Sequence, residues 1–211
     1  MGRRERKKLQ TRQLLADTAR RLFAERGFEQ VSVAEVAREA DVAEATVFNY
    51  FPTKEDLVFS GLERFEDELL AAVRDRPRGE SILQAFGRFV LEPRGFLAAG
   101  DEQSAQRLLE VSRMIAQSPA LLAREQQVFA RYTTSLAQLI AEETRAAGDD
   151  PRPAVVAAAL IGIHRALIDH VRLHILAGND DLARLARSTR AAGRKALALL
   201  ERGLADYGPK M

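Results

Sequence analysis

The chain has 211 residues, 46% hydrophobic and 29% charged, a length and composition that suit one large globular domain or two small ones. Its 32 Lys and Arg residues against 30 Asp and Glu residues leave a net charge of only +2, so the overall charge indicates no class of partner. Cysteine is absent, which excludes disulfides, thiolate catalysis and thiolate metal sites and fits a reducing compartment.

The first twelve residues are strongly basic, since six Lys or Arg side chains and one acid leave this stretch with a charge of +5. A run of like charges is typical either of a solvated tail or of an arm that binds a polyanion. We predict a basic N-terminal arm over residues 1–10. Its candidate contacts to nucleic acid are Arg4, Arg6, Lys7 and Lys8. The stretch lacks the apolar segment of a signal peptide, so we expect a cytoplasmic protein.

Two helices are predicted directly after the arm. Apolar residues recur at helical spacing over residues 11–26, and Gly27 follows as a stop signal. Ser32 and Glu35 then form a capping-box pattern at the start of a short second helix, which ends at Ala40.

A turn leads from there into a third short helix over residues 44–51. Val47 and Phe51 share one face of this helix and are expected to anchor it in the core. The other face has no apolar pattern and carries Glu44, Ala45, Phe48 and Asn49. Two short helices joined by a tight turn are typical of a helix-turn-helix.

The rest of the chain continues as helices separated by turn signals. Thr53 can cap a helix that begins at Lys54, where exposed backbone N–H groups favour an anion. The predicted helices cover residues 54–75, 80–92, 101–116, 119–147, 153–177 and 181–204. We therefore predict an all-α fold of about nine helices, with a helix-turn-helix domain over residues 11–56 and a C-terminal domain over residues 57–211.

Three stretches carry a resemblance to a known family. They are AERGF at Ala24–Phe28, VSVAEVA at Val31–Ala37 and TVFNYFPTKEDL at Thr46–Leu57. Together they resemble the N-terminal domain of the tetracycline-repressor (TetR) family of bacterial transcription regulators, over residues 11–60. The resemblance implies a third helix that enters the DNA major groove, C-terminal helices that enclose a small-molecule pocket, and a dimer formed by the last two helices.

Within that motif, each matching side chain can be given a role by its chemistry. Phosphate contacts, which position a protein without reading sequence, are expected from Ser32, Thr46, Tyr50 and Lys54. Asn49 can hydrogen-bond an adenine edge, and Ala45 and Phe48 can touch thymine methyl groups. Glu44 is an acid where DNA is expected, so it either accepts a hydrogen bond from cytosine N4 or discriminates against unwanted sites.

Two positions depart from the usual family pattern. Asp41 stands where the turn commonly has glycine, and it is expected to adopt the left-handed conformation. Ala43 stands where a small hydroxyl residue usually opens the third helix, so the N-cap hydrogen bond is missing at a cost of about 0.5–2 kcal/mol.

The C-terminal helices at residues 153–177 and 181–204 carry apolar stripes. These stripes serve either a dimer interface or only the core of one subunit, and we predict a homodimer through them. The longest strongly apolar run, Ala154–Ile163, is half of the roughly 20 residues that a membrane span requires, so no membrane partner is expected.

A partly apolar small-molecule effector is expected in the C-terminal domain. Its candidate contacts are Phe86, Phe89, Val90, Leu109, Phe129 and Tyr132, with Arg113 and His164 as polar groups, although core packing explains the same residues. His170 and His174 are four residues apart, a spacing that can hold a metal. No third ligand lies at a diagnostic spacing, so we expect a satisfied or solvent-facing pair and no metal.

No catalytic or phosphate-binding motif appears, so neither an enzyme nor a cofactor is expected. The sequence predicts a homodimeric regulator that binds a pseudo-palindromic double-stranded DNA operator. It predicts a repressor that a small molecule releases by moving the helix at residues 54–75. The alternatives are an all-helical adaptor that binds a protein and a small helical enzyme with dispersed residues.

Overall fold

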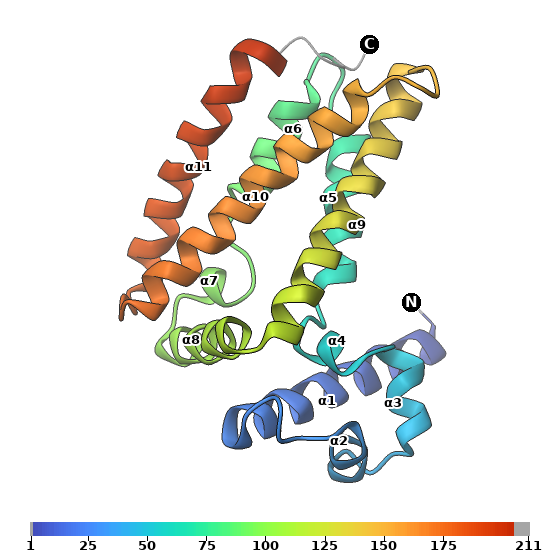
Figure 1. Cartoon of the computed structure of the whole chain (residues 1–211), viewed down its shortest axis with the longest axis vertical. Helices are drawn as coiled ribbons and strands as arrows, with labels where there is room; N and C mark the ends of the chain where they lie inside the picture. Colours follow the sequence, from blue (N-terminus) through green and yellow to red (C-terminus); the bar gives the residue numbers. More distant parts are fainter. Residues whose placement is uncertain (1, 205–211) are drawn as a thin grey trace. The chain divides into compact units, whose positions relative to one another are not determined.

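The computed structural model describes residues 2–204, and the side chains of all of these except residues 3, 62, 63, 202 and 204. The helices of this part are α1 (Arg3–Arg26), α2 (Val33–Glu39), α3 (Glu44–Tyr50), α4 (Lys54–Val58), α5 (Leu62–Arg74), α6 (Ile82–Val90), α7 (Phe96–Ala99), α8 (Glu102–Gln117), α9 (Pro119–Thr144), α10 (Arg152–Leu176) and α11 (Leu182–Leu204). No β-strand occurs within residues 2–204, and the predicted all-α fold is confirmed (Figure 1).

Three helices differ from their predicted bounds. The stretch predicted as a basic arm forms the first turns of α1, whose start is capped when Gly2 N donates to Glu5 Oε2 at 2.8 Å. The helix predicted over residues 54–75 is interrupted between α4 and α5 at Gly61, a residue with low helix propensity. The short α7 lies in the region predicted as a loop after residue 92. These changes give eleven described helices where nine were predicted.

The chain divides into two compact units. The N-terminal unit holds residues up to Glu63 together with Arg113–Arg124, and the C-terminal unit holds Arg64–Ser112 and the residues from Glu125 onward. The division differs from the predicted boundary after residue 56, because a segment in the middle of the chain packs with the N-terminal helices.

The core of the N-terminal unit is formed where α1 packs on α2 and α4, and α2 on α3. Its buried side chains are Leu15, Ala19, Leu22, Phe23, Phe28, Val31, Val36, Val47, Phe51 and Leu57. Phe23 and Phe28 meet edge to face, with ring centroids 5.1 Å apart, an arrangement that aromatic pairs prefer.

Two polar contacts hold the corner between α8 and α9 in this same unit. Ser118 Oγ donates to Glu29 Oε1 at 2.7 Å, from a side chain that is almost fully buried. Arg124 donates from Nε and Nη2 to Asp56 Oδ1, at 2.9 and 2.7 Å. The corner is therefore tied both to the α1–α2 loop and to the first turn of α4.

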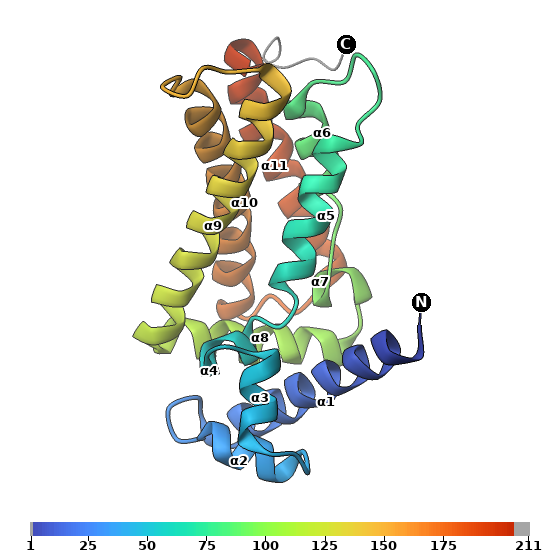
Figure 2. The same cartoon turned by 90° about the vertical axis from the view of Figure 1, so that its right-hand side faces the viewer.

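The C-terminal unit is a bundle of helices with the short α7 at one end (Figure 2). Glu66 of α5 accepts hydrogen bonds from Arg131 Nε at 2.8 Å and Ser135 Oγ at 2.6 Å, both on α9. Arg172 of α10 forms an ion pair with Glu125 near the N-terminal end of α9. These polar contacts fix α9 against its two neighbours.

Two glycines let α6 and α11 approach each other closely. A Cβ atom on Gly193 would lie 2.4 Å from Leu91 Cδ2, and one on Gly87 would lie 2.9 Å from Leu197 Cδ1. Gly87 therefore leaves room for Leu197 of α11, and Gly193 leaves room for Leu91 at the end of α6. This close approach is made inside the subunit.

Candidate nucleic-acid interface and effector site

The connection from α2 to α3 has the local geometry that the sequence predicts. Ser32 caps α2, since its Oγ accepts from Glu35 N at 3.2 Å while Ser32 N donates to Glu35 Oε2 at 2.8 Å. The hydrogen bond that Ser32 N donates, together with one that Ser32 Oγ donates to the same oxygen at 2.9 Å, lowers the pKa of the Glu35 carboxyl. Asp41 adopts a φ of 53°, which confirms the left-handed turn, and Ala43 gives α3 no side-chain cap.

Helix α3 has the two faces that were predicted. Val47 and Phe51 are each 1% exposed and pack into the core of the N-terminal unit. Phe48 is 45% exposed, which is unusual for a phenylalanine in a small domain, and Asn49 beside it is exposed as well. Glu44, Ala45 and Ser32 are also exposed. The side chains assigned to base reading are therefore accessible.

Three of the assigned phosphate contacts are only partly exposed: Thr46, Tyr50 and Lys54. Lys54 Nζ lies 4.2 Å from the ring centroid of Phe28, so the ammonium group is oriented by a cation–π contact. The expected anion site at the start of α4 is taken by Asp56, whose Oδ2 accepts from Thr53 N at 3.1 Å. The phosphate contact expected from Lys54 stays a prediction.

The candidate contacts of the basic stretch are all exposed on the first turns of α1: Arg4, Arg6, Lys7 and Lys8. They belong to the same unit as α3 and Lys54. Because these four cations lie on one helix, the helical backbone fixes their spacing. Their contact with DNA stays a prediction.

Four of the eight candidate effector contacts form one group with Phe65, a residue of α5 that was not among the candidates. The ring of Phe65 lies 5.3 Å from Phe89, 5.6 Å from Tyr132 and 4.6 Å from His164, measured between centroids. Phe129 completes the group at 6.0 Å from His164. We call these five residues the aromatic cluster. Its signal in the sequence is the apolar stripe of the helix that carries Phe65.

The other four candidates differ in their burial and in their packing partners. Phe86 is fully buried and Val90 partly buried. Leu109 packs against a separate group of buried residues, formed by Ala105, Ile175, Leu182 and Leu185. Arg113 is exposed and belongs to the N-terminal unit.

Two polar groups at the aromatic cluster, besides the Tyr132 hydroxyl, are a neutral imidazole and a guanidinium. Burial, with a smaller effect of the positive charge of Arg94, lowers the pKa of His164 to about 4. The guanidinium of Arg94 lies 3.8 Å from the ring centroid of Phe89. Among the described residues its buried Nε has no hydrogen-bond partner, although its terminal nitrogens reach Glu68 and the Phe89 carbonyl.

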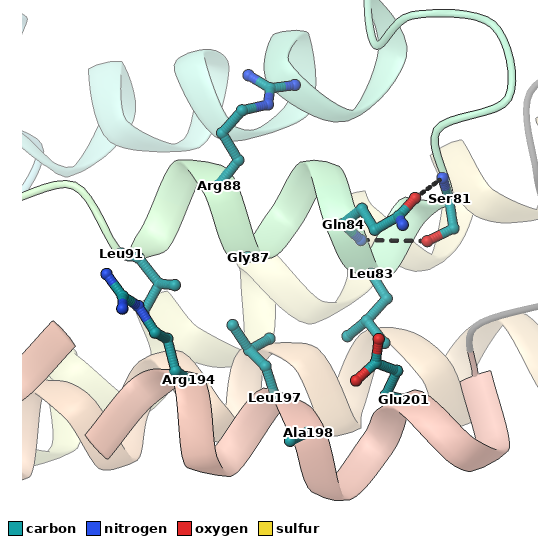
Figure 3. Close-up of a pocket in the computed structure, with 10 residues that line it drawn as sticks. All are labelled: Ser81, Leu83, Gln84, Gly87, Arg88, Leu91, Arg194, Leu197, Ala198 and Glu201. Carbon is teal, nitrogen blue, oxygen red and sulfur yellow. Dashed lines mark hydrogen bonds between the residues drawn. The ribbon is translucent and has the colours of Figure 1, made fainter. Parts of the chain in front are cut away.

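A groove of about 280 Å³ runs between α6 and α11. Figure 3 shows Leu83, Leu91 and Leu197 between the two helices, whereas Arg88 points away from α11. Arg88 pairs with Glu80 at 3.0 Å, and this contact raises the pKa of its guanidinium. Sequence reasoning missed the groove because its apolar residues fit a core stripe and its polar residues fit a solvated helix face.

His170 and His174 contact each other on α10, with ring centroids 4.1 Å apart. His174 Nδ1 lies 2.8 Å from the carbonyl oxygen of His170, and burial followed by the charge of His174 lowers the pKa of His170. Within the part of the chain that the structure describes, no group of three or more His, Cys, Asp or Glu side chains could hold a metal ion.

Comparison with known proteins decides the family. A family model for bacterial regulatory proteins of the tetR family matches residues 15–60, and one for the MftR C-terminal domain matches residues 80–205. The second match alone covers more than half of the chain. The chain belongs to the TetR family. Proteins of this family are transcriptional regulators that bind DNA operators and small-molecule effectors.

The regulator TcmR of Streptomyces glaucescens is 29% identical over 167 residues, which cover 78% of this chain and 74% of TcmR. A candidate regulator of mycofactocin biosynthesis, MftR of Mycobacterium tuberculosis, is 26% identical over 163 residues, or 74% of this chain and 77% of MftR. A solved SmeT–triclosan complex shares the fold, with a TM-score of 0.53, 16% identity and coverage of 88% and 90%. These TetR-family relatives are regulators and not enzymes.

The buried imidazole of His164 should make stability depend on pH. Because its folded-state pKa of about 4 lies below the unfolded value of 6.5, its contribution is present above pH 6.5 and is lost as the pH falls toward 4. Between pH 7 and pH 5 the loss is about 2 kcal/mol. Urea unfolding should therefore show that the wild type loses about 2 kcal/mol more than His164→Phe over this interval. Equal losses in the two proteins would contradict the assignment.

Proposed function

We propose that this TetR-family protein is a cytoplasmic, homodimeric repressor that a small molecule releases from a pseudo-palindromic operator. The observation that carries DNA binding is the exposed face of α3, where Phe48 and Asn49 project from a helix whose opposite face is buried. A helix presented in this way can enter the major groove and read base edges. The cations on the first turns of α1 would add contacts to phosphates.

The dimer is supported by the exposed face of α10. Val155 and Leu173 are 62% and 67% exposed, and they lie five full helical turns apart on one face that also carries the exposed Gly162 and Ala166. By length and composition α10 could cross a membrane. Only 33% of its most apolar window is buried within the subunit, so much of this apolar face remains to be covered. One such helix is weak evidence for a membrane span, and a second copy of the chain would cover the same face.

In such a dimer the two α3 helices would occupy successive major grooves, about 34–36 Å apart. An effector that binds preferentially to a form with a different spacing lowers operator affinity by the difference in its binding free energy. The expected lever, one continuous helix over residues 54–75, is interrupted between α4 and α5. We propose that α8 and α9 also transmit the change, because both helices continue from one compact unit into the other.

The aromatic cluster is our proposed effector site. It combines the rings of Phe65, Phe89, Phe129 and Tyr132 with a neutral imidazole and with the Nε of Arg94, a buried donor that has no partner among the described residues. An apolar or aromatic molecule with a hydrogen-bond acceptor would satisfy this donor.

Asn49→Ala tests the reading role of α3. We expect it to weaken binding by about 1–3 kcal/mol on the duplex that the wild type selects from a random library, and by less on a duplex of random sequence. Gel shifts at two salt concentrations measure both. Lys8→Ala is the control and should weaken both duplexes alike while lowering the salt slope by about one. If Asn49→Ala weakened both duplexes equally, Asn49 would not read a base.

Leu173→Glu tests the dimer. An acid at this exposed position would be placed against its symmetry mate or buried in an apolar face, so we expect a monomer at micromolar concentration in light scattering. Leu14→Glu replaces a leucine that is 50% exposed on α1, outside the proposed interface, and should leave the dimer intact. A dimeric Leu173→Glu protein would exclude this face as the interface.

Effector binding should raise the melting temperature, because a ligand that binds only the native state stabilises it. We expect a compound found by a thermal-shift screen of metabolites to lose its shift in Arg94→Gln and in His164→Phe. Ala198→Phe, which fills the groove between α6 and α11, is the control and should keep the shift. If Ala198→Phe lost the shift while Arg94→Gln and His164→Phe kept it, the effector site would be the groove and not the aromatic cluster.

A further inference from the structure

The C-terminal end of α3 is held by a side chain from a distant part of the chain. Helix α3 ends at Tyr50, and Pro52 follows two residues later. The last carbonyl groups of a helix have no partner within it, and a proline offers no N–H. The carbonyl oxygen of Tyr50 instead accepts a hydrogen bond from Arg12 Nη1 at 2.7 Å, across 38 residues of sequence.

The same guanidinium group makes a second contact at this end. Its central carbon lies 4.5 Å from the ring centroid of Phe51, a side chain that is 1% exposed and anchors α3 in the core. A planar guanidinium can donate along its edge while its face lies on an aromatic ring, which an ammonium group cannot do. Arg12 thus contacts both the backbone and the anchor of α3.

Arg12 differs in its surroundings from the other cations near the start of the chain. It is partly buried, whereas Arg4, Arg6, Lys7 and Lys8 are exposed on the surface of α1. Those cations are the ones predicted to contact a polyanion. The geometry of Arg12 is that of a group which holds one helix against another.

We propose that Arg12 is a positioning residue for sequence reading: it fixes the C-terminal end of α3 and hence the direction in which Phe48 and Asn49 project. The proposal rests on the proposed function of α3 as the helix that reads DNA. A helix of two turns that is free to pivot at one end would still meet phosphates, but its base contacts would be misplaced. Loss of Arg12 should therefore reduce specificity more than affinity for DNA in general.

The test compares full-length wild type, Arg12→Lys, Arg12→Ala and Lys8→Ala on the selected duplex and on a duplex of random sequence. We expect Arg12→Lys, which keeps the charge, to bind the selected duplex about 10-fold more weakly and the random duplex within about 3-fold of wild type. Its salt slope should stay unchanged. Lys8→Ala should lower both affinities alike and reduce the slope.

A double-mutant cycle separates positioning from simple support of the fold. If Arg12 acts through Asn49, Arg12→Lys should cost much less in an Asn49→Ala background than in the wild type. Lys8→Ala should cost the same in both backgrounds. Circular dichroism at the assay temperature checks that each variant is folded, and Arg12→Lys decides the question if Arg12→Ala unfolds.

If Arg12→Ala lost affinity equally on both duplexes and lowered the salt slope, Arg12 would be a phosphate contact and the proposal would be overturned. Additive losses in the cycle would overturn it as well. If the wild type selects no duplex, the proposed reading function of α3 fails and the role of Arg12 fails with it. If the wild type selects a duplex and only the cycle is additive, the function stands and the role of Arg12 alone is wrong.

Discussion

A helix of seven residues has no independent stability in water, and α3 is such a helix. Its conformation therefore depends on the contacts that its neighbours make with it. Val47 and Phe51 supply these contacts on the buried face, and Arg12 supplies them at the C-terminal end. The start of the helix receives no side-chain cap from Ala43. The exposed face does not pack in the core. Its side chains are therefore available for contacts outside the protein.

Two carboxylates of the N-terminal unit likewise make contacts with distant residues. Asp56 caps α4 through one oxygen and accepts from Arg124 through the other. Glu29 lies in the loop between α1 and α2 and accepts from Ser118 at the α8–α9 corner. Each pair joins a residue of the first sixty to a residue near position 120. Since both pairs are partly buried, breaking either would leave a polar group that water satisfies only in part.

Local chemistry explains why the N-terminal unit could be predicted well. The capping box of Ser32, the left-handed Asp41 and the two faces of α3 depend on residues within a few positions of one another. The helix bounds failed where a local pattern was weak. The basic start of α1 has no apolar periodicity, and the interruption near Gly61 lies inside a continuous amphipathic pattern.

Contacts between distant segments could not be predicted, because helical periodicity states which face is buried but not against what. Phe65 shows this limit, since its apolar position was evident while its place at the centre of the aromatic cluster depends on α9 and α10. Leu109 and Arg113 were grouped with that cluster on residue type alone, and they lie elsewhere. Arg12 was counted only as one more charge in a basic stretch.

The contrast between Arg12 and its exposed neighbours has a physical cause that composition does not reveal. A cation beside water gains little from a single contact, because solvent screens it and the side chain loses conformational freedom. A guanidinium held between a carbonyl oxygen and an aromatic ring gains from two directional contacts at once. An arginine can therefore either attract a polyanion or orient a helix that reads DNA. Its burial and its contacts decide which.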